Sequence, residues 1–144
     1  MKITNEICWL FGFLKPRKTK KGIGIYGNME LQQKFLKKVL ELKLAKPEKI
    51  FIEKNRISFR HVKLENLLKK IEEKKFEIFS RKNKATCYFL KGLYESCGEG
   101  NMLKNISYND QMLIERLGFL TRRSGKNIYI INFDSFQEFL KKFD

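Results

Sequence analysis

The side chains of this chain that could take part in chemistry are mainly basic. Lysine and arginine gather in three clusters: Lys15, Arg17, Lys18, Lys20 and Lys21; Arg81, Lys82 and Lys84; and Arg122, Arg123 and Lys126. Cationic side chains bind phosphate groups and release their counterions. The alternative for any one cluster is a solvated surface, but clusters that recur in both halves of the chain favour a shared binding surface.

Groups typical of catalysis are sparse. His61 is the only histidine, and no second histidine or cysteine lies at metal-ligand spacing from it. No Ser/His/Asp or Cys/His pairing stands out. Cys97 beside Gly98 suits a packed cysteine better than a reactive thiol. The segment 22–27 has the letters of a G-x-G-x-x-G nucleotide motif, but no buried strand precedes it, so it is itself a strand.

Composition favours a polyanionic partner. The 144 residues carry 31 Lys+Arg against 16 Asp+Glu, a formal net charge of +15. Such an excess suits nucleic acid or an anionic membrane surface, and nucleic acid is the preferred reading. No apolar run reaches the roughly 18 residues that a membrane span needs. Three unpaired cysteines and the absence of a signal-peptide pattern predict a cytoplasmic protein, which would be prokaryotic and nucleoid-associated if it binds DNA.

Two apolar helices with central glycines organise the chain. They are expected at 4–14 and 85–96, and Leu10 and Gly12 match Leu90 and Gly92. A glycine inside a helix costs about 1 kcal/mol relative to alanine. Two glycines at matched places therefore predict that the helices touch there. The order of the elements also repeats, which predicts two half-domains, 1–80 and 81–144.

Each half is predicted to be helix, strand, helix, hairpin, helix, which is an α+β fold. After the first glycine helix come a strand at 22–27, a helix at 28–43 capped by Asn28, a hairpin at 49–53 and 56–60, and a helix at 63–73. After the second come a strand at 102–107, a helix at 109–117, a hairpin at 119–123 and 127–132, and a helix at 134–142. Strand alternation puts Arg56, Ser58 and Arg60 on one face of a sheet. Amphipathic helices would cover the opposite, apolar face and leave a basic sheet surface open, where Ser58, Asn105 and Thr121 could reach base edges.

The glycine helices resemble the signature helices of LAGLIDADG homing endonucleases in their monomeric, two-repeat form. Residues Leu90–Gly98 match the motif position by position, and Leu10–Lys18 is a weaker copy. The resemblance implies that both motif helices pack at a pseudo-two-fold axis. It also implies an antiparallel β saddle, covered by helices, that lies along duplex DNA.

The eighth motif position departs from the family. In the family an acid stands there on each helix, and the pair holds divalent metal for phosphodiester cleavage. Here the two positions are Arg17 and Cys97. Arginine cannot ligate Mg²⁺, and a thiol is a poor ligand for this hard cation. Only Glu95 and Glu99 lie near the second position. We therefore expect no metal, no cofactor and no efficient cleavage, with Arg17 placing positive charge against the phosphate instead.

The sequence thus predicts a monomeric protein that binds double-stranded DNA, with no membrane partner. One alternative is a weak or nicking endonuclease that uses Mg²⁺ with Glu95 or Glu99. Another is a maturase-like RNA-binding protein, whose Tyr26, Tyr108 and Tyr129 stack on bases. Gly12 and Gly92 are the predicted packing residues. The predicted nucleic-acid contacts are Lys15, Arg17, Lys18, Lys20, Lys21, Lys54, Arg56, Arg60, Arg81, Lys82, Lys104, Arg122, Arg123 and Lys126.

Overall fold

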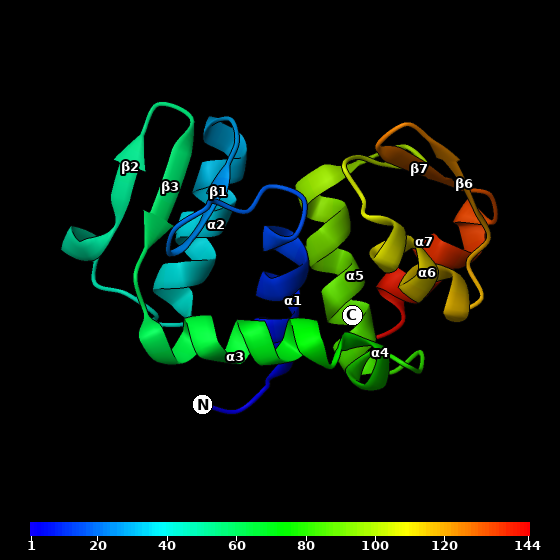
Figure 1. Ribbon diagram of the computed structural model, residues 1–144, viewed down its shortest axis with the longest axis horizontal. Helices are drawn as coiled ribbons and strands as arrows, with labels where there is room; N and C mark the ends of the chain where they lie inside the picture. The colour runs from blue at the N-terminus through cyan, green and yellow to red at the C-terminus, as the bar shows by residue number, and fades with distance from the viewer.

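Two α/β halves flank a central pair of helices in the computed structural model, which describes residues 1–144 (Figure 1). The central helices are α1 (Asn5–Leu14) and α5 (Lys84–Cys97). Along the chain, α1 is followed by β1 (Ile23–Tyr26), α2 (Met29–Glu41), a 3-10 turn (Pro47–Lys49), β2 (Phe51–Glu53), β3 (Arg56–Phe59), α3 (Val62–Glu73), α4 (Lys75–Ile78) and then α5. After α5 come β4 (Gly98–Glu99), β5 (Met102–Leu103), α6 (Tyr108–Arg116), β6 (Thr121–Ser124), β7 (Asn127–Ile130) and α7 (Phe133–Lys141).

Each half contains one antiparallel sheet. The first has the order β1-β3-β2 and the second β4-β5-β7-β6. A short segment after α1 pairs with β1 at the edge of the first sheet, because the amide of Thr19 donates to the carbonyl of Gly24 at 3.1 Å. Ile57 and Phe59 of β3 are buried, while Arg56 and Ser58 are half-buried on the other face. The alternation expected from the sequence is therefore present.

Helices cover the apolar face of each sheet. In the first half, Phe35 of α2 packs on Phe59 of β3, with ring centroids 6.0 Å apart. In the second, Phe119 packs edge-on against Phe136 of α7 at 5.2 Å. The buried apolar side chains of both halves form one continuous core of 33 residues. The division at residue 80 stays a prediction. No helix is long and apolar enough to cross a membrane.

The central helices meet backbone to backbone at their glycines. A Cβ atom added to Gly12 would lie 2.1 Å from the carbonyl oxygen of Phe89, and one added to Gly92 would lie 2.0 Å from that of Trp9. Real Cβ atoms do not approach oxygens so closely, so only glycine permits this crossing. Both helices begin at side-chain caps, since Thr4 accepts from the amide of Ile7 and Asn83 from that of Thr86.

Some local predictions were wrong. The strand expected at 102–107 ends at Leu103, because Ser107 begins the next helix by accepting a hydrogen bond from the amide of Asp110. The helix expected from residue 109 begins at Tyr108, so Asn109 lies inside it. The short α4 and β4 were not predicted. Asn28, by contrast, caps α2 as expected and accepts from the amide of Leu31.

Candidate nucleic-acid interface

Arg17 and Cys97 occupy equivalent positions in the two halves. After α1, the carbonyl of Arg17 accepts a hydrogen bond from the amide of Tyr26 at 2.8 Å. After α5, the carbonyl of Cys97 accepts one from the amide of Lys104 at 3.1 Å. The same backbone contact thus joins the end of each motif helix to the strand that follows. This equivalence rests on geometry and agrees with the motif alignment.

The side chain of Arg17 crosses to the other half. Its Nε donates to the carbonyl oxygen of Ser96 at 2.7 Å, and one terminal nitrogen lies 3.5 Å from the carbonyl oxygen of Tyr26. Ser96 belongs to the last turn of α5, where free carbonyls give the helix end a partial negative charge. The guanidinium is therefore fixed by a contact that also complements the helix dipole.

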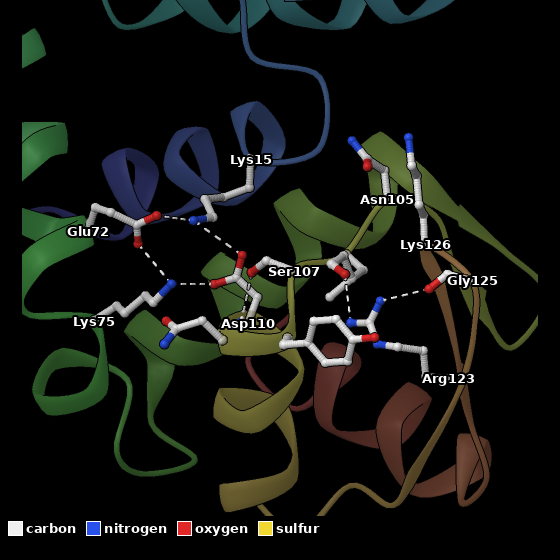
Figure 2. A pocket seen from close by; sticks show the side chains of 12 residues that line it. Lys15, Glu72, Lys75, Asn105, Ser107, Asp110, Arg123, Gly125 and Lys126 are labelled. Carbon is white, nitrogen blue, oxygen red and sulfur yellow. Dashed lines mark hydrogen bonds and ion pairs between the residues drawn. The ribbon is translucent and has the colours of Figure 1, made fainter.

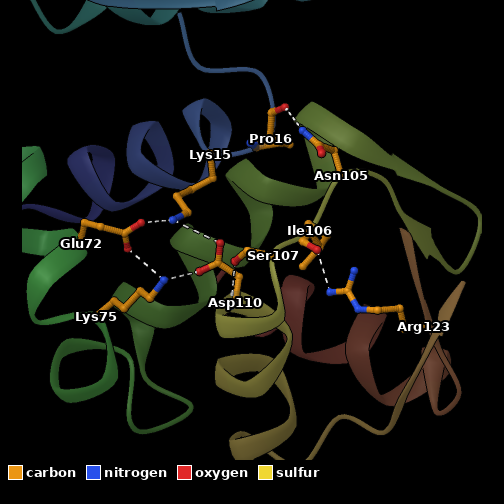
Figure 3. A network of polar contacts seen from close by, with 9 residues as sticks. All are labelled: Lys15, Pro16, Glu72, Lys75, Asn105, Ile106, Ser107, Asp110 and Arg123. Carbon is orange, nitrogen blue, oxygen red and sulfur yellow. Dashed lines mark hydrogen bonds and ion pairs between the residues drawn. The ribbon is translucent and has the colours of Figure 1, made fainter. Parts of the chain in front are cut away.

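Asn105 makes the reciprocal contact. Its side-chain amide donates to the carbonyl oxygen of Pro16 at 2.8 Å (Figure 3). Pro16 and Ser96 each precede the equivalent residues Arg17 and Cys97. The end of each motif helix is thus tied by a side chain from the opposite half. Asn105 also adopts the left-handed backbone, φ +55°, which asparagine tolerates better than most residues.

Cys97 is a buried, neutral thiol. It is 5% exposed, and its Sγ donates to the carbonyl oxygen of Leu93 at 3.3 Å. Burial raises the pKa of the thiol to about 12. A metal ligand must be the thiolate, and this group holds its proton at neutral pH. Together, a guanidinium and a neutral thiol do not fit a divalent cation.

Neither nearby carboxylate replaces the missing acids. Glu95 accepts a hydrogen bond from the indole nitrogen of Trp9. Glu99 pairs with Lys104 at 2.5 Å, and this hydrogen bond lowers the pKa of the Glu99 carboxyl. No group of three or more His, Cys, Asp or Glu side chains lies together in a way that could hold a metal ion. The side chains at the ends of the two motif helices, a guanidinium and a neutral thiol, therefore offer a metal ion no anionic ligand.

Several predicted contact residues are held by carboxylates. Arg56 pairs with Glu53 at 2.5 Å, and Arg60 pairs with Glu65 at 3.3 Å. The hydrogen bond that Arg56 donates to Glu53 raises the pKa of Arg56, which is a cation in any case. These pairs neutralise part of the positive charge on the first sheet. Lys104 is paired in the same way with Glu99.

Arg123 is used inside the second half. It donates to the side chain of Gln111 at 2.8 Å and to the carbonyl of Ile106 at 2.7 Å, and it stacks 4.0 Å from the ring centroid of Tyr108. Thr121 likewise bonds to Gln111 at 2.9 Å. Both strand residues thus lie on the side of the sheet that faces α6. The prediction that Thr121 lies on the open face of the sheet was therefore wrong, because the strand register places it beside the buried Ile130.

The remaining predicted cations are exposed. Lys82 lies over the ring of Phe119, 4.5 Å from its centroid. Free of any carboxylate partner are Lys18, Lys20, Lys21, Lys54, Arg81, Arg122 and Lys126. These residues come from the segment after α1, the two hairpins and the loop before α5. Unpaired, exposed cations are the ones able to exchange small counterions for phosphates.

An ion cluster that sequence reasoning missed joins the two halves. Lys75 lies 2.7 Å from Asp110 and 3.0 Å from Glu72, and Lys15 contacts Glu72 and Asp110 (Figure 3). Lys75 and Asp110 are 5% and 4% exposed. Burial alone would raise the pKa of Glu72, but hydrogen bonds from Lys15 and Lys75 outweigh it and lower the pKa. Glu72 and Lys75 are three residues apart, but no spacing rule in the sequence connects them with Lys15 or Asp110.

The cluster lies at one end of an open polar cavity of about 850 Å³. Figure 2 shows Arg123 and Gly125 at the other end, with Asn105 and Lys126 side by side above them. Lys15, predicted as a nucleic-acid contact, thus belongs to the wall of this cavity and to the cluster. Its role in holding the halves together is visible only in three dimensions.

The paired glycine helices and the two flanking antiparallel sheets are the fold of LAGLIDADG homing endonucleases, which confirms the fold prediction. Among solved structures, a double variant of the LAGLIDADG enzyme I-DmoI matches 95% of this chain and 96% of its own, with a TM-score of 0.63. That crystal structure contains its target DNA, nicked in the coding strand, and manganese. The two chains are 17% identical, so the likeness concerns the fold. No protein-family model and no curated protein matches the chain.

Proposed function

We propose that this protein binds double-stranded DNA across its two sheets and does not cleave it efficiently. The observation that supports this proposal most directly is the position of Arg17, a cation fixed between the ends of both motif helices. The similar I-DmoI variant is described with target DNA, so duplex DNA is the polyanion that this fold accommodates there. The free cations of the hairpin tips and of the segment after α1 suit contacts to the two DNA backbones.

The lack of efficient cleavage follows from the chemistry at the motif helix ends. Metal-assisted hydrolysis needs cations that stabilise the attacking and leaving oxygens. Arg17 repels a divalent cation, and the protonated thiol of Cys97 offers it no charge. Arg17 can still attract the phosphate electrostatically, as a binding group. The alternative of a weak or nicking endonuclease needs a free carboxylate near these helix ends. Glu95 would have to give up its hydrogen bond with Trp9, or Glu99 its ion pair with Lys104.

The test is binding to random-sequence duplex DNA over a range of salt concentrations. With several phosphate contacts, affinity falls steeply between about 50 and 200 mM salt. Affinity that ignores salt, or no binding at low salt, contradicts the proposal. Competition with a structured RNA of equal length separates duplex DNA from the RNA alternative. A plasmid-nicking assay with Mg²⁺ tests the nuclease alternative, and nicking that Glu95→Gln or Glu99→Gln abolishes would support it.

A further inference from the structure

Strand pairing establishes which residues are equivalent on the open faces of the two sheets. Because Arg17 corresponds to Cys97, Gly24 of β1 corresponds to Met102 of β5. Across the first sheet, Gly24 pairs with Ser58 and Ser58 with Phe51. Across the second, Met102 pairs with Tyr129, and Tyr129 with Arg122. Phe51 and Arg122 therefore occupy the same place in their respective halves.

Phe51 is an exposed apolar ring on the open face. The residue is 63% exposed, although its strand pairs with β3, the central strand of the first sheet. The residues beside it in the same row, Ser58 and Gly24, are small, so the ring has little side-chain cover. Lys49 and Lys54 flank its strand without carboxylate partners. An apolar group in cationic surroundings suits a partner that presents methyl groups between phosphates.

Arg122 presents different chemistry from the equivalent position. It is exposed, has no carboxylate partner, and lies 5.7 Å from the ring centroid of Tyr129. The aromatic ring supports the guanidinium by a cation–π contact and leaves its donors free. Guanine presents two acceptors, O6 and N7, that fit these donors in the major groove. Thymine presents a 5-methyl group there, which fits an apolar side chain.

The strands that carry the two residues lie at the outer ends of the molecule. β2 and β6 are edge strands of their sheets and flank the central helices from opposite sides (Figure 1). Residues at these places would meet different arms of a bound duplex. A second copy of the chain is a poor partner for β2, because lysines flank the strand and the net charge of +15 repels a like molecule.

From these observations we propose that the two halves recognise the two arms of a duplex by different chemistry. Phe51 contacts a thymine 5-methyl group in one arm, and Arg122 contacts the O6 and N7 of a guanine in the other. This inference rests on the proposed duplex DNA binding. It adds which residue of each half contacts a base and which base each of these residues prefers.

The experiment begins with the selection of preferred duplexes from a random pool by the intact chain. Each thymine of the selected site is then replaced by uracil, which removes only the 5-methyl group, and each guanine by 7-deazaguanine, which removes N7. We expect one uracil replacement to weaken binding about threefold to fourfold, in line with one lost methyl contact. We expect one 7-deazaguanine replacement in the opposite arm to weaken binding on the order of tenfold.

Variants assign each effect to its residue. Phe51→Ala should abolish the uracil effect and keep the 7-deazaguanine effect. Ile52→Ala is the matched control, because Ile52 is 58% exposed on the other face of the same strand. Arg122→Ala removes every donor of the side chain and should abolish the 7-deazaguanine effect.

The outcomes separate this inference from the proposed function. If the pool yields no preferred sequence, or if Phe51→Ala leaves the uracil effect intact, the inference is overturned while DNA binding stands. If the chain binds no duplex even at low salt, the proposed function itself fails. If Phe51→Ala instead dissolves an oligomer, Phe51 serves self-association and the inference is again overturned.

Discussion

At the end of α5, the guanidinium of Arg17 lies where a helix terminus carries partial negative charge. Its contact with Ser96 orients the charge, so little freedom of the side chain remains to be lost on binding. A flexible surface lysine loses more side-chain entropy when it meets a phosphate. This fixed orientation suits the proposed role of Arg17 as a phosphate-binding group.

Replacing Arg17 with glutamine should weaken duplex DNA binding and reduce the salt slope by about one. The measurement is the dissociation constant at several salt concentrations. Lys37→Gln is the control, because Lys37 is exposed on α2, which covers the opposite face of the first sheet. If both variants change the slope equally, Arg17 has no special place in the interface.

The buried thiol of Cys97 links stability to alkaline pH. Burial raises its native pKa to about 12, whereas the pKa of a cysteine in an unfolded chain is about 8.5. Above the unfolded value, the unfolded chain releases a proton that the native protein keeps. The thiol's contribution to stability is therefore complete below about pH 8.5 and is lost as pH rises, by up to about 1.4 kcal/mol per unit.

Urea unfolding between pH 8 and pH 10 measures this loss. Cys97→Ser keeps a small hydrogen-bonding side chain that does not ionise in this range, so its stability should decline less steeply with pH. Equal slopes for the two proteins would show that Cys97 does not titrate on unfolding.

The sequence predicts where the two motif helices end but not the side-chain contacts made there. The spacing of the motif predicts Arg17 and Cys97 as equivalent residues, and backbone hydrogen bonds join both to the following strands. It does not predict that Arg17 binds Ser96, because that contact spans 79 residues. The use of Arg123 inside the second half also depends on the register between β6 and β7, which composition does not determine.

Among the elements, the crossing of α1 and α5 depends most directly on residue type. Each glycine lets the other helix's backbone approach, so two matched letters in the sequence predicted a tertiary contact. Amphipathic periodicity predicted α2 and α3 well for the same reason, since both bury one apolar face. The four-residue α4 carries no such periodicity. Its first residue, Lys75, is buried only because carboxylates from α3 and α6 receive its charge.

Replacing Gly92 with alanine tests the helix crossing. Helix propensity alone would make alanine stabilising by about 1 kcal/mol. The added Cβ would instead lie 2.0 Å from the carbonyl oxygen of Trp9, so we expect destabilisation of about 1–3 kcal/mol. The sign of the change in unfolding free energy decides between the two, and a stabilised variant would contradict the close crossing.

The ion cluster between α4 and α6 should be costly to break. Asp110→Asn leaves Lys75 with reduced charge compensation in a buried place, so we expect a loss of about 3 kcal/mol in unfolding free energy. Glu53→Gln is the control, because it breaks an exposed, solvent-screened pair with Arg56 and should cost much less unfolding free energy. Equal losses for the two variants would mean that the buried cluster adds nothing to stability.

At the scale of the whole molecule, the proposed DNA binding relies on positive charge and not on a bound metal ion. With Arg17 between the helix ends and a net charge of +15, DNA affinity should not depend on a specific metal. Exchanging Mg²⁺ for EDTA at matched ionic strength should leave the dissociation constant within roughly twofold. A large loss of affinity in EDTA would indicate a metal site elsewhere in the interface.

The glycine crossing also limits how this chain can evolve. At most packed positions, a larger side chain on one element is offset by a smaller one on its neighbour. Here the neighbour of each glycine is a carbonyl group of the main chain, which no substitution can shorten. Natural variants should therefore keep glycine at 12 and at 92 independently, without paired changes. Lineages of this protein are free to exchange the chemistry at the ends of these helices, but not the crossing that holds the ends together.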